Sequence, residues 1–485
     1  MENTSQSERK KSVLGAIAAS KLSEMLKNID ISSIKETTGG YNARARILAL
    51  FDMGTFAETG AYIVRREPGE DPSEMFSGVI TGYGAVNGRL VYAFVQDSAR
   101  MRGAFDSTSA GKIAELIRLA ARNGAPVVGI FDSCGASIYE GARVLAAYGE
   151  VMRQINAVKG TIPLIALIPG VCGGGMAAFA STFDFILTVS GQSDFYVSPP
   201  FISGEAPSDG TSVADIAVAD EDELYPRTRE LLSYLPSNCN EGARMSDAPV
   251  FDRDIPTEYL APKEYDARKI VACLSDGDRF ISLGSGSVPE LVSGLAYVGG
   301  IACGVLANDQ HEHSGMMTAR DSFGLPLIAL ANTAGACPDE ADSAGYAEAV
   351  AGLYTALTIS ENAKISVVTG GAYGMGFTLM ASKSVGADIA FALPDSCISP
   401  MSPEASVAFA WNDRICDNDV TVTREQLEAE WRERLASPCD AALCGQIDDI
   451  IPADELRLRV VSAVRMLAAK SRSVPTPRRE GRRQK

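Results

Sequence analysis

One feature limits the fold of this sequence more than any other: proline, glycine and small polar residues recur at an offset of 200. The matched pairs are Pro126 and Pro326, Asp132 and Asn332, Ser133 and Thr333, Gly135 and Gly335, Gly170 and Gly370, and Gly174 and Gly374. Further upstream, VYAFVQD resembles IACGVLAND at an offset of 212, so the copies differ by insertions. A repeat of this length predicts two structural copies of one domain.

Each copy contains a β-branched apolar run that ends in glycines. The first is IPLIALIPGVCGGGMAAF at 162–179, and the second is ISVVTGGAYGMGF at 365–377. Such runs are typical of strands buried on both faces of a parallel sheet, and the small residues that follow predict a helix start. A glycine turn from strand to helix has no side chains, so it exposes backbone N–H groups at the positive end of the helix dipole. It can bind an anion or a transient oxyanion. The alternative is a packing turn that binds nothing.

The repeat also sets the expected domain boundaries of this α/β chain. Its 485 residues exceed the ~250–300 at which one core stops growing. We expect a peripheral segment at 1–40, a first copy at 41–200, a connecting segment at 201–264, a second copy at 265–470 and a basic tail at 471–485. The tail is either a solvated end or a site for an acidic partner or phosphate. The order strand, helix, strand, glycine turn and helix occurs twice in the chain. This order predicts right-handed crossover units in each copy.

Several local patterns predict individual elements. The Asn-Gly pair at 87–88 predicts the turn of a β-hairpin. Apolar spacing predicts helices over Ser109–Asn123 and Ala453–Lys470, with further helices at 13–27 and at about 221–235. Thr423 followed by Gln426 predicts a capping box at the start of a helix.

Composition excludes several classes of function. A formal charge of −17 argues against a nucleic-acid-binding protein, which needs a basic face. No apolar run approaches the roughly 20 residues of a membrane span, and the N-terminus does not resemble a signal peptide, so we expect a cytoplasmic protein. Ten cysteines without a CxxC pair predict reduced thiols and no disulfides.

The side chains offer few of the usual catalytic groups. His311 and His313 are the two histidines, and a metal would need further ligands, so no metal is expected. Ser133 and Ser137 have no histidine in their own copy, which argues against a catalytic triad. The absence of glutamate from 170–204 argues against a paired-carboxylate hydratase. Catalysis by backbone N–H groups remains, and two such turns suit a reaction in which two separate oxygens become negative.

Several longer motifs of the sequence resemble those of a known family. ARARILALFDMGTFAE, DSCGASIYEG, IPGVCGGGMA, YDARKIVACLSDGDRF, GGAYGMGF and GQIDDIIP are similar in order and spacing to motifs of the biotin-dependent acyl-CoA carboxyltransferases. This family includes the β subunits of propionyl-CoA carboxylases and the carboxyltransferase subunits of methylmalonyl-CoA and glutaconyl-CoA decarboxylases. The resemblance covers about residues 40–470 and implies two tandem crotonase-like superdomains.

The resemblance implies that CO2 passes between a biotin nitrogen and the α-carbon of a short-chain acyl-CoA. Two backbone oxyanion holes would stabilise the thioester and ureido oxygens, and biotin itself could take the α-proton. The implied acyl-CoA side consists of the first hole, Gly174 and Gly175, with Gly135, Ala136 and Gly173. The implied biotin side consists of the second hole, Met375 and Gly376, with Gly335, Ala336 and Gly374.

The same resemblance implies partners. The sequence has no Met-Lys-Met biotin-attachment motif, so biotin would arrive on a biotin carboxyl carrier protein or another subunit. A biotin carboxylase or membrane decarboxylase subunits would complete the complex. In this family the site forms between copies of the chain, so a dimer is the minimum and a hexamer is expected. Cys134, Ser137 and Met375 depart from the family pattern. A catalytically degenerate paralogue with a structural or regulatory role, or another crotonase-type CoA enzyme, are the alternatives.

Overall fold

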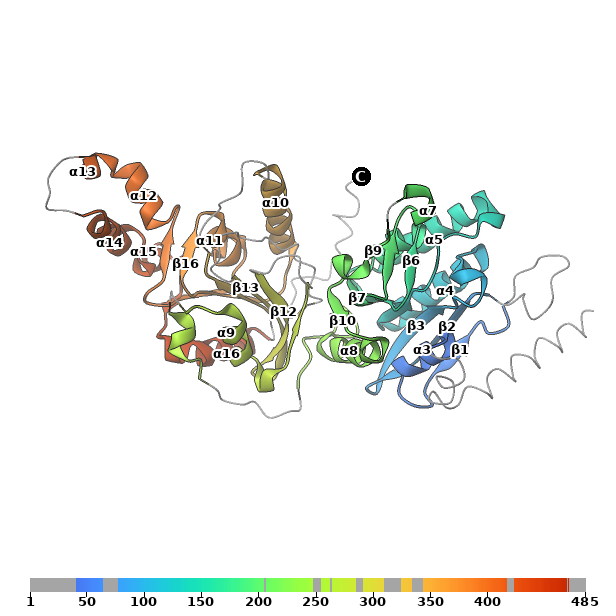
Figure 1. Ribbon diagram of the computed structural model, residues 1–485. Helices are drawn as coiled ribbons and strands as arrows, with labels where there is room; N and C mark the ends of the chain where they lie inside the picture. Colours follow the sequence, from blue (N-terminus) through green and yellow to red (C-terminus); the bar gives the residue numbers. More distant parts are fainter. Residues whose placement is uncertain are drawn as a thin grey trace, which may run out of the picture. The chain divides into compact units, whose positions relative to one another are not determined.

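The computed structural model describes residues 41–63, 77–204, 206–246, 254–261, 264–284, 291–308, 324–333, 343–416, 423–468 and 470. The chain divides into two compact units, which we describe separately (Figure 1). The first comprises Met1–Ser233 and Ser237–Cys239, and the second comprises Tyr234–Pro236 and Asn240–Lys485. The helix expected at 13–27, the histidine loop and the basic tail lie outside the described residues.

A seven-stranded sheet forms the first unit, in the order β1-β2-β3-β4-β5-β7-β10. Its strands are β1 (Ala57–Thr59), β2 (Val79–Val86), β3 (Arg89–Gln96), β4 (Val127–Ile130), β5 (Leu164–Ile168), β7 (Phe185–Val189) and β10 (Ile216–Val218). The first three strands pair antiparallel, and the pairs from β3 to β10 are parallel. A small second sheet contains β6 (Val171–Gly173), β8 (Asp194–Tyr196) and β9 (Ser208–Asp209).

The second unit repeats this design, in the order β11-β12-β13-β14-β15-β17-β19. Its strands are β11 (Phe280–Ser282), β12 (Leu291–Val298), β13 (Ile301–Asn308), β14 (Leu327–Ala331), β15 (Lys364–Val368), β17 (Ile389–Ala392) and β19 (Asp449–Ile450), with β16 (Gly371–Tyr373) and β18 (Cys397–Ser399) in a separate pair. The strands β4, β5 and β6 begin 200 residues before β14, β15 and β16, and the two hairpins are 212 residues apart. The predicted duplication is therefore confirmed.

Helices accompany the sheet of each unit (Figure 1). The first unit has α3 (Ala43–Leu50), α4 (Ser107–Asn123), α5 (Ala142–Val158), α6 (Gly175–Ala180), α7 (Pro200–Ser203) and α8 (Glu221–Tyr234). The second has α9 (Ala267–Leu274), α10 (Ser343–Ile359), α11 (Met375–Met380), α12 (Pro403–Ala410), α13 (Asn412–Cys416), α14 (Arg424–Leu435), α15 (Pro438–Leu443) and α16 (Leu456–Leu467). Short 3₁₀ helices span Met101–Gly103, Ile138–Glu140, Gly210–Val213, Thr257–Leu260, Asp276–Asp278, Lys383–Val385 and Ala453–Glu455.

The local predictions are confirmed with small changes at the ends. Asn87 and Gly88 both have positive φ in the β2–β3 turn. The helix predicted from Ser109 begins two residues earlier, because Asp106 caps it by accepting the N–H of Ser109. The capping box of Thr423 is present at the start of α14. The last predicted helix opens with a 3₁₀ turn before α16.

Part of the expected connecting segment belongs to the first unit. Within 201–264, β10 pairs in parallel with β7 at the edge of the first sheet, and α8 follows it. In the second unit, β19 pairs with β17 and α16 follows. Each unit therefore ends with an edge strand and a helix.

A clamp ties the last helix of the first unit to its beginning. Asp52, just after α3, accepts the N–H of Gly88 in the hairpin turn at 2.8 Å. Arg229 of α8 donates to Asp52 at 2.6 Å and to the carbonyl of Leu50 at 2.9 Å. One arginine thus joins the end of α3 and the carboxylate that holds the hairpin.

The second unit contains the same clamp. Asp276, just after α9, accepts the N–H of Gly300 in the β12–β13 turn at 2.6 Å. Arg457 of α16 donates to Asp276 at 2.8 Å and to the carbonyl of Cys273 at 3.1 Å. The equivalence extends the duplication to the last helix of each unit, which the sequence comparison had not reached.

The clamp of the first unit should weaken in acid. The N–H of Gly88, and then the guanidinium of Arg229, hold the pKa of Asp52 below its ordinary value of 3.8. A lowered pKa gives stability that is full above about pH 4 and is lost as the pH falls through the folded-state pKa. Urea unfolding of the wild type and of Asp52→Asn should therefore differ more at pH 7 than at about pH 2.5. An equal difference at both values would contradict this role.

Aromatic packing fixes the short helix α6 in the first unit. Phe179 of α6 packs at 5.4 Å against the ring of Phe131 and at 5.6 Å against that of Phe183. A helix of only six residues has little stability of its own. The buried rings therefore hold α6, and the glycine turn before it, against the sheet.

Candidate functional site

The two glycine turns have the same backbone geometry. Gly174, which precedes α6, has φ 61° and ψ −134°, and Gly374, which precedes α11, has φ 51° and ψ −123°. Side chains avoid this region, so both positions require glycine. Neither helix has a side-chain cap, and the first N–H groups of a helix have no partner inside it. Both turns therefore present helix N-termini, as the sequence predicts.

One member of the predicted first oxyanion pair already has a hydrogen-bond partner. The N–H of Gly174 donates to the carbonyl of Tyr196 at 2.9 Å, beside the β6–β8 pairing. In the second unit, Gly374 donates in the same way to Ser399 at 3.1 Å. Gly175, the first residue of α6, is exposed at the surface. Gly175 is therefore the more exposed residue of the first pair.

The loop after β4 packs against the first glycine turn. Ser133 donates its N–H to the carbonyl of Val171 at 2.6 Å, and Gly173 donates to Ser133 at 2.9 Å. A Cβ on Gly174 would lie 3.7 Å from the Cα of Gly135. The structure therefore brings together Gly135, Gly173 and Gly174, and Ala136 follows in the same loop, where it bridges to Phe105.

The second turn is built in the same way. Thr333 donates its N–H to Gly371 at 2.6 Å, and a Cβ on Gly376 would come within 2.6 Å of the Thr333 hydroxyl oxygen. Met375 is 39% exposed, so its side chain is not buried in the turn. Two residues of the predicted biotin side, Gly335 and Ala336, lie outside the described residues.

A buried ionic cluster supports the first turn, and sequence reasoning missed it. The carboxylate of Asp132 accepts the N–H of Val171 at 3.3 Å and pairs with Arg46 of α3 at 2.5 Å. Arg46 also bonds to Glu221 of α8 at 2.8 Å. Burial alone would lower the pKa of Arg46, but hydrogen bonds and the charges of Glu221 and Asp132 outweigh it and raise that pKa.

In the second unit, a neutral asparagine takes the place of the aspartate that supports the first turn. The amide oxygen of Asn332 accepts the N–H of Gly371 at 2.9 Å, as Asp132 does for Val171. The α9 motif YDARKI matches the α3 motif YNARAR, and it has the buried Ile270 where the first copy has Arg46. Aspartate with arginine in one copy is thus replaced by asparagine with isoleucine in the other. The correlated exchange keeps the hydrogen bond and avoids an unpaired buried charge.

Comparison with known proteins places this geometry in a family. Residues 35–204 and 208–481 match the model of the carboxyl transferase domain. The chain belongs to the carboxyl transferase domain family. The propionyl-CoA carboxylase beta chain of Saccharopolyspora erythraea is 30% identical over 492 residues, which cover 90% of this chain and 89% of that protein. The methylmalonyl-CoA decarboxylase subunit alpha of Veillonella parvula is 30% identical over 488 residues, covering 91% and 93%.

Solved structures agree with this assignment. A transcarboxylase 12S structure, a hexamer with methylmalonyl-coenzyme A and methylmalonic acid bound, matches with a TM-score of 0.84 and 26% identity, covering 94% of this chain and 97% of that one. The fold is therefore that of two tandem crotonase-like domains. Because the relatives are carboxyltransferases or decarboxylases, the resemblance and the assignment as an enzyme of this class are confirmed.

Large apolar side chains are exposed around both turns of this carboxyl transferase. Near the first, Ile138 and Tyr139 of the loop before α5 are 83% and 78% exposed, and Val197 after β8 is also exposed. In the second unit, Met375 is 39% exposed in the turn itself, and Met401, two residues after the Ser399 carbonyl that accepts the N–H of Gly374, is also 39% exposed. Phe409 of α12 is 80% exposed. Such apolar surface is typical of contacts with another protein.

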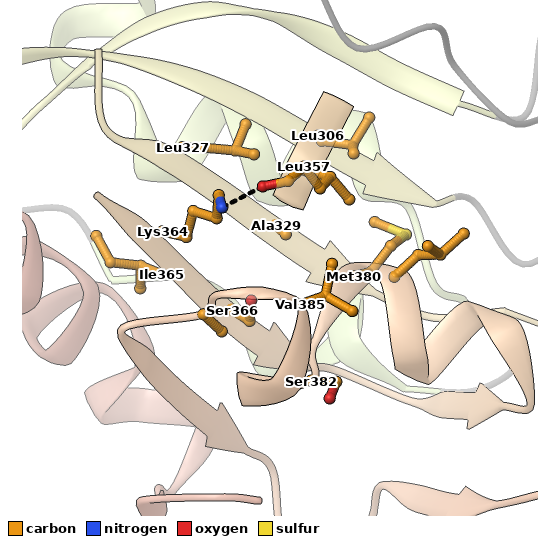
Figure 2. A pocket seen from close by; sticks show the side chains of 12 residues that line it. Leu306, Leu327, Ala329, Leu357, Lys364, Ile365, Ser366, Met380, Ser382 and Val385 are labelled. Atoms are coloured by element: carbon orange, nitrogen blue, oxygen red, sulfur yellow. Dashed lines mark hydrogen bonds between the residues drawn. The ribbon is translucent and has the colours of Figure 1, made fainter. Parts of the chain in front are cut away.

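A small cavity in the second unit is lined by none of the residues of the glycine turn (Figure 2). It is lined by residues of β14, β15, α10 and α11, and its ≈ 10 Å³ is near the minimum for one water molecule. The ammonium group of Lys364 donates to the carbonyls of Leu357 and Ser360 at the end of α10. Lys364 therefore caps a helix C-terminus, and the cavity is too small for a CoA ester.

The described residues contain neither a membrane-spanning helix nor a cluster of metal-binding side chains. Among them, no helix is both long and apolar enough to cross a membrane. No group of three or more His, Cys, Asp or Glu side chains is placed to bind a metal in the same part of the chain.

Proposed function

We propose that this chain is the carboxyltransferase subunit that moves CO2 between biotin on a partner and the α-carbon of a short-chain acyl-CoA of the propionyl or methylmalonyl type. The observation that carries the proposal is the pair of equivalent glycine turns, one in each unit, each presenting the start of a helix. The similarity to carboxylase and decarboxylase subunits over about nine-tenths of the chain supports it.

The first turn suits the thioester. As the α-carbon gains or loses a carboxyl group, negative charge develops on the thioester oxygen. The N–H of Gly175, which is an exposed residue, and the positive end of α6 would stabilise that charge. Gly135 and Ala136, in the loop after β4, would shape the wall that meets the acyl group. A Cβ on Gly173 would come within 2.5 Å of the Tyr196 ring, so glycine there lets this ring pack behind the wall.

The second turn suits biotin. Bound there, biotin would supply the ureido nitrogen that carries the carboxyl group and the oxygen that becomes negative when this group leaves. The N–H groups of Met375 and Gly376, in the first turn of α11, are donors of the right kind for this oxygen. A Cβ on Gly374 would press to 3.2 Å from the carbonyl of Pro400, so the turn keeps its shape only with glycine.

The proposal includes partners and a location. Biotin would come on a carrier protein, and a biotin carboxylase or membrane decarboxylase subunits would complete the cycle. The exposed apolar side chains near each turn favour assembly of several copies, at least a dimer and, as in the transcarboxylase structure, a hexamer. We place the complex in the cytoplasm.

A labelled-carboxyl exchange assay tests the proposed function. The purified chain should transfer ¹⁴C-carboxyl groups from methylmalonyl-CoA or malonyl-CoA to free biotin. If no acyl-CoA supports exchange while CoA and a sister subunit still bind, the second candidate, a degenerate structural or regulatory subunit, is correct. The exposed Cys134 in the first loop and Met375 in the second turn favour that candidate, because both add bulk at the site.

Alkylation of Cys134 should inhibit the exchange. Its thiol is exposed in the loop that packs against the first turn, so an added acetamide group would narrow the acyl-CoA site. Activity should fall in proportion to the label on Cys134, and methylmalonyl-CoA should protect it. Cys134→Gly should resist, although the exposed Cys439 and Cys444 still react. Inhibition of Cys134→Gly at the wild-type rate would contradict a site in this loop.

A further inference from the structure

A buried tyrosine lies directly against the first glycine turn. Tyr148 of α5 is only 9% exposed, and its ring packs at 4.5 Å from that of Phe105. If Gly175 had a Cβ, this atom would lie 2.9 Å from Cζ of Tyr148, the carbon that bears the hydroxyl. The hydroxyl end of the ring is therefore the part closest to the turn.

This contact explains why residue 175 is glycine. Gly175 is not among the residues with positive φ, and it opens the helix α6, so its backbone does not require glycine. Glycine is needed at this position because a side chain would collide with the ring of Tyr148. Glycine here keeps the phenol at the backbone of the turn.

The hydroxyl of Tyr148 has no hydrogen-bond partner in the described part of the chain, although it is buried. An unpaired buried hydroxyl destabilises a protein, so a phenylalanine would be the more stable choice here. Burial raises the pKa of Tyr148, which keeps the group protonated and able to donate. The thiols of Cys172 and Cys134 raise this pKa further through their charges.

The second unit lacks this arrangement. The offset of 200 pairs Gly175 with Met375, a residue with a long side chain. The same offset pairs Tyr148 with Glu348 of α10. A tyrosine and a glycine in the first copy are thus matched by a glutamate and a methionine in the second.

We propose that the hydroxyl of Tyr148 is a second donor to the thioester oxygen at the first turn, beside the N–H of Gly175. The N–H of Gly174 is engaged by Tyr196, so an oxyanion here needs another donor than the predicted one. The thioester oxygen of the substrate accepts the hydrogen bond that the Tyr148 hydroxyl does not make within the described part of the chain. This inference rests on the proposed function, and it assigns the acyl-CoA to the first unit.

The test is Tyr148→Phe, with Tyr92→Phe as the matched control. Loss of one oxyanion donor typically lowers kcat by ~10²-fold or more. Tyr148→Phe should show this loss with an unchanged or higher Tm, because no protein hydrogen bond is broken. Tyr92 is a buried tyrosine of β3 whose hydroxyl accepts from Asn123 at 2.9 Å, so its removal should change Tm and leave kcat unaltered.

Two results would overturn the inference. If kcat of Tyr148→Phe stays within about twofold of the wild type, the ring of Tyr148 only packs against the turn and its hydroxyl has no role in catalysis. A fall in kcat together with a lower Tm would show a structural role. An inactive wild type removes the proposed function itself, whereas an active wild type with an unaffected variant removes only the role of Tyr148.

Discussion

Asp132→Ala should destabilise the protein by about 3 kcal/mol, the lower end of the range for removing one partner of a buried ion pair. Asp132 neutralises Arg46 and accepts the N–H of Val171, and alanine can do neither. Glu221 would still pair with Arg46, which is why the lower end is expected. Urea unfolding at pH 7 measures the loss.

A neutral replacement of the whole cluster is the control. The triple variant Arg46→Ile, Asp132→Asn and Glu221→Gln copies the isoleucine and asparagine of the second unit and removes the carboxylate that would be left unpaired. It should recover most of the lost stability, since apolar or neutral groups can replace a buried ionic cluster at little cost. A loss below about 1 kcal/mol in the single variant, or a triple variant that is less stable still, would show that the cluster does not support the turn.

Gly174→Ala should reduce carboxyl transfer by ~10²-fold or more, which is the effect of disturbing an oxyanion site. Apart from the Cα of Gly135 at 3.7 Å, no atom lies within 4 Å of the added methyl group outside the adjoining residues, so it would occupy the space between loop and turn. At φ 61° any side chain is also strained, by about 1–3 kcal/mol. Alanine is preferable to valine here, because a β-branched side chain would add strain that obscures the result.

Gly191→Ala is the control that distinguishes backbone strain from obstruction of the site. Gly191 also has a positive φ, 68°, and a Cβ there meets nothing within 4 Å. Both variants should lose a few degrees of Tm, and only Gly174→Ala should lose transfer activity. Wild-type kcat in Gly174→Ala would remove the first turn from the mechanism, as would an equal loss of activity in Gly191→Ala.

The sequence was informative wherever neighbouring residues determine the structure. The hairpin turn at Asn87, the capping box at Thr423 and the glycine turns follow from local backbone preferences, and the repeat located the glycine turn in both copies. The N–H of Gly174 shows the limit of such reasoning. Its bond to Tyr196 depends on the pairing of β6 with β8, strands of three residues each. Strands this short have no recognisable periodicity.

Long-range partners could not be predicted from one sequence. Arg46 and Asp132 are 86 residues apart, and Arg46 and Glu221 are 175 apart, so no spacing rule joins them. Tyr148 has the helical spacing of an ordinary core residue, and only its contact with Gly175 distinguishes it. A closer comparison of the two copies would have given one signal, because arginine and aspartate in the first are exchanged for isoleucine and asparagine in the second.

The paired clamps have a consequence for how this polypeptide can be made. Arg229 returns to Asp52 and Arg457 returns to Asp276, so the ends of each half are fastened to each other. A shorter product that stopped after Cys239 would therefore still contain both partners of the first fastening.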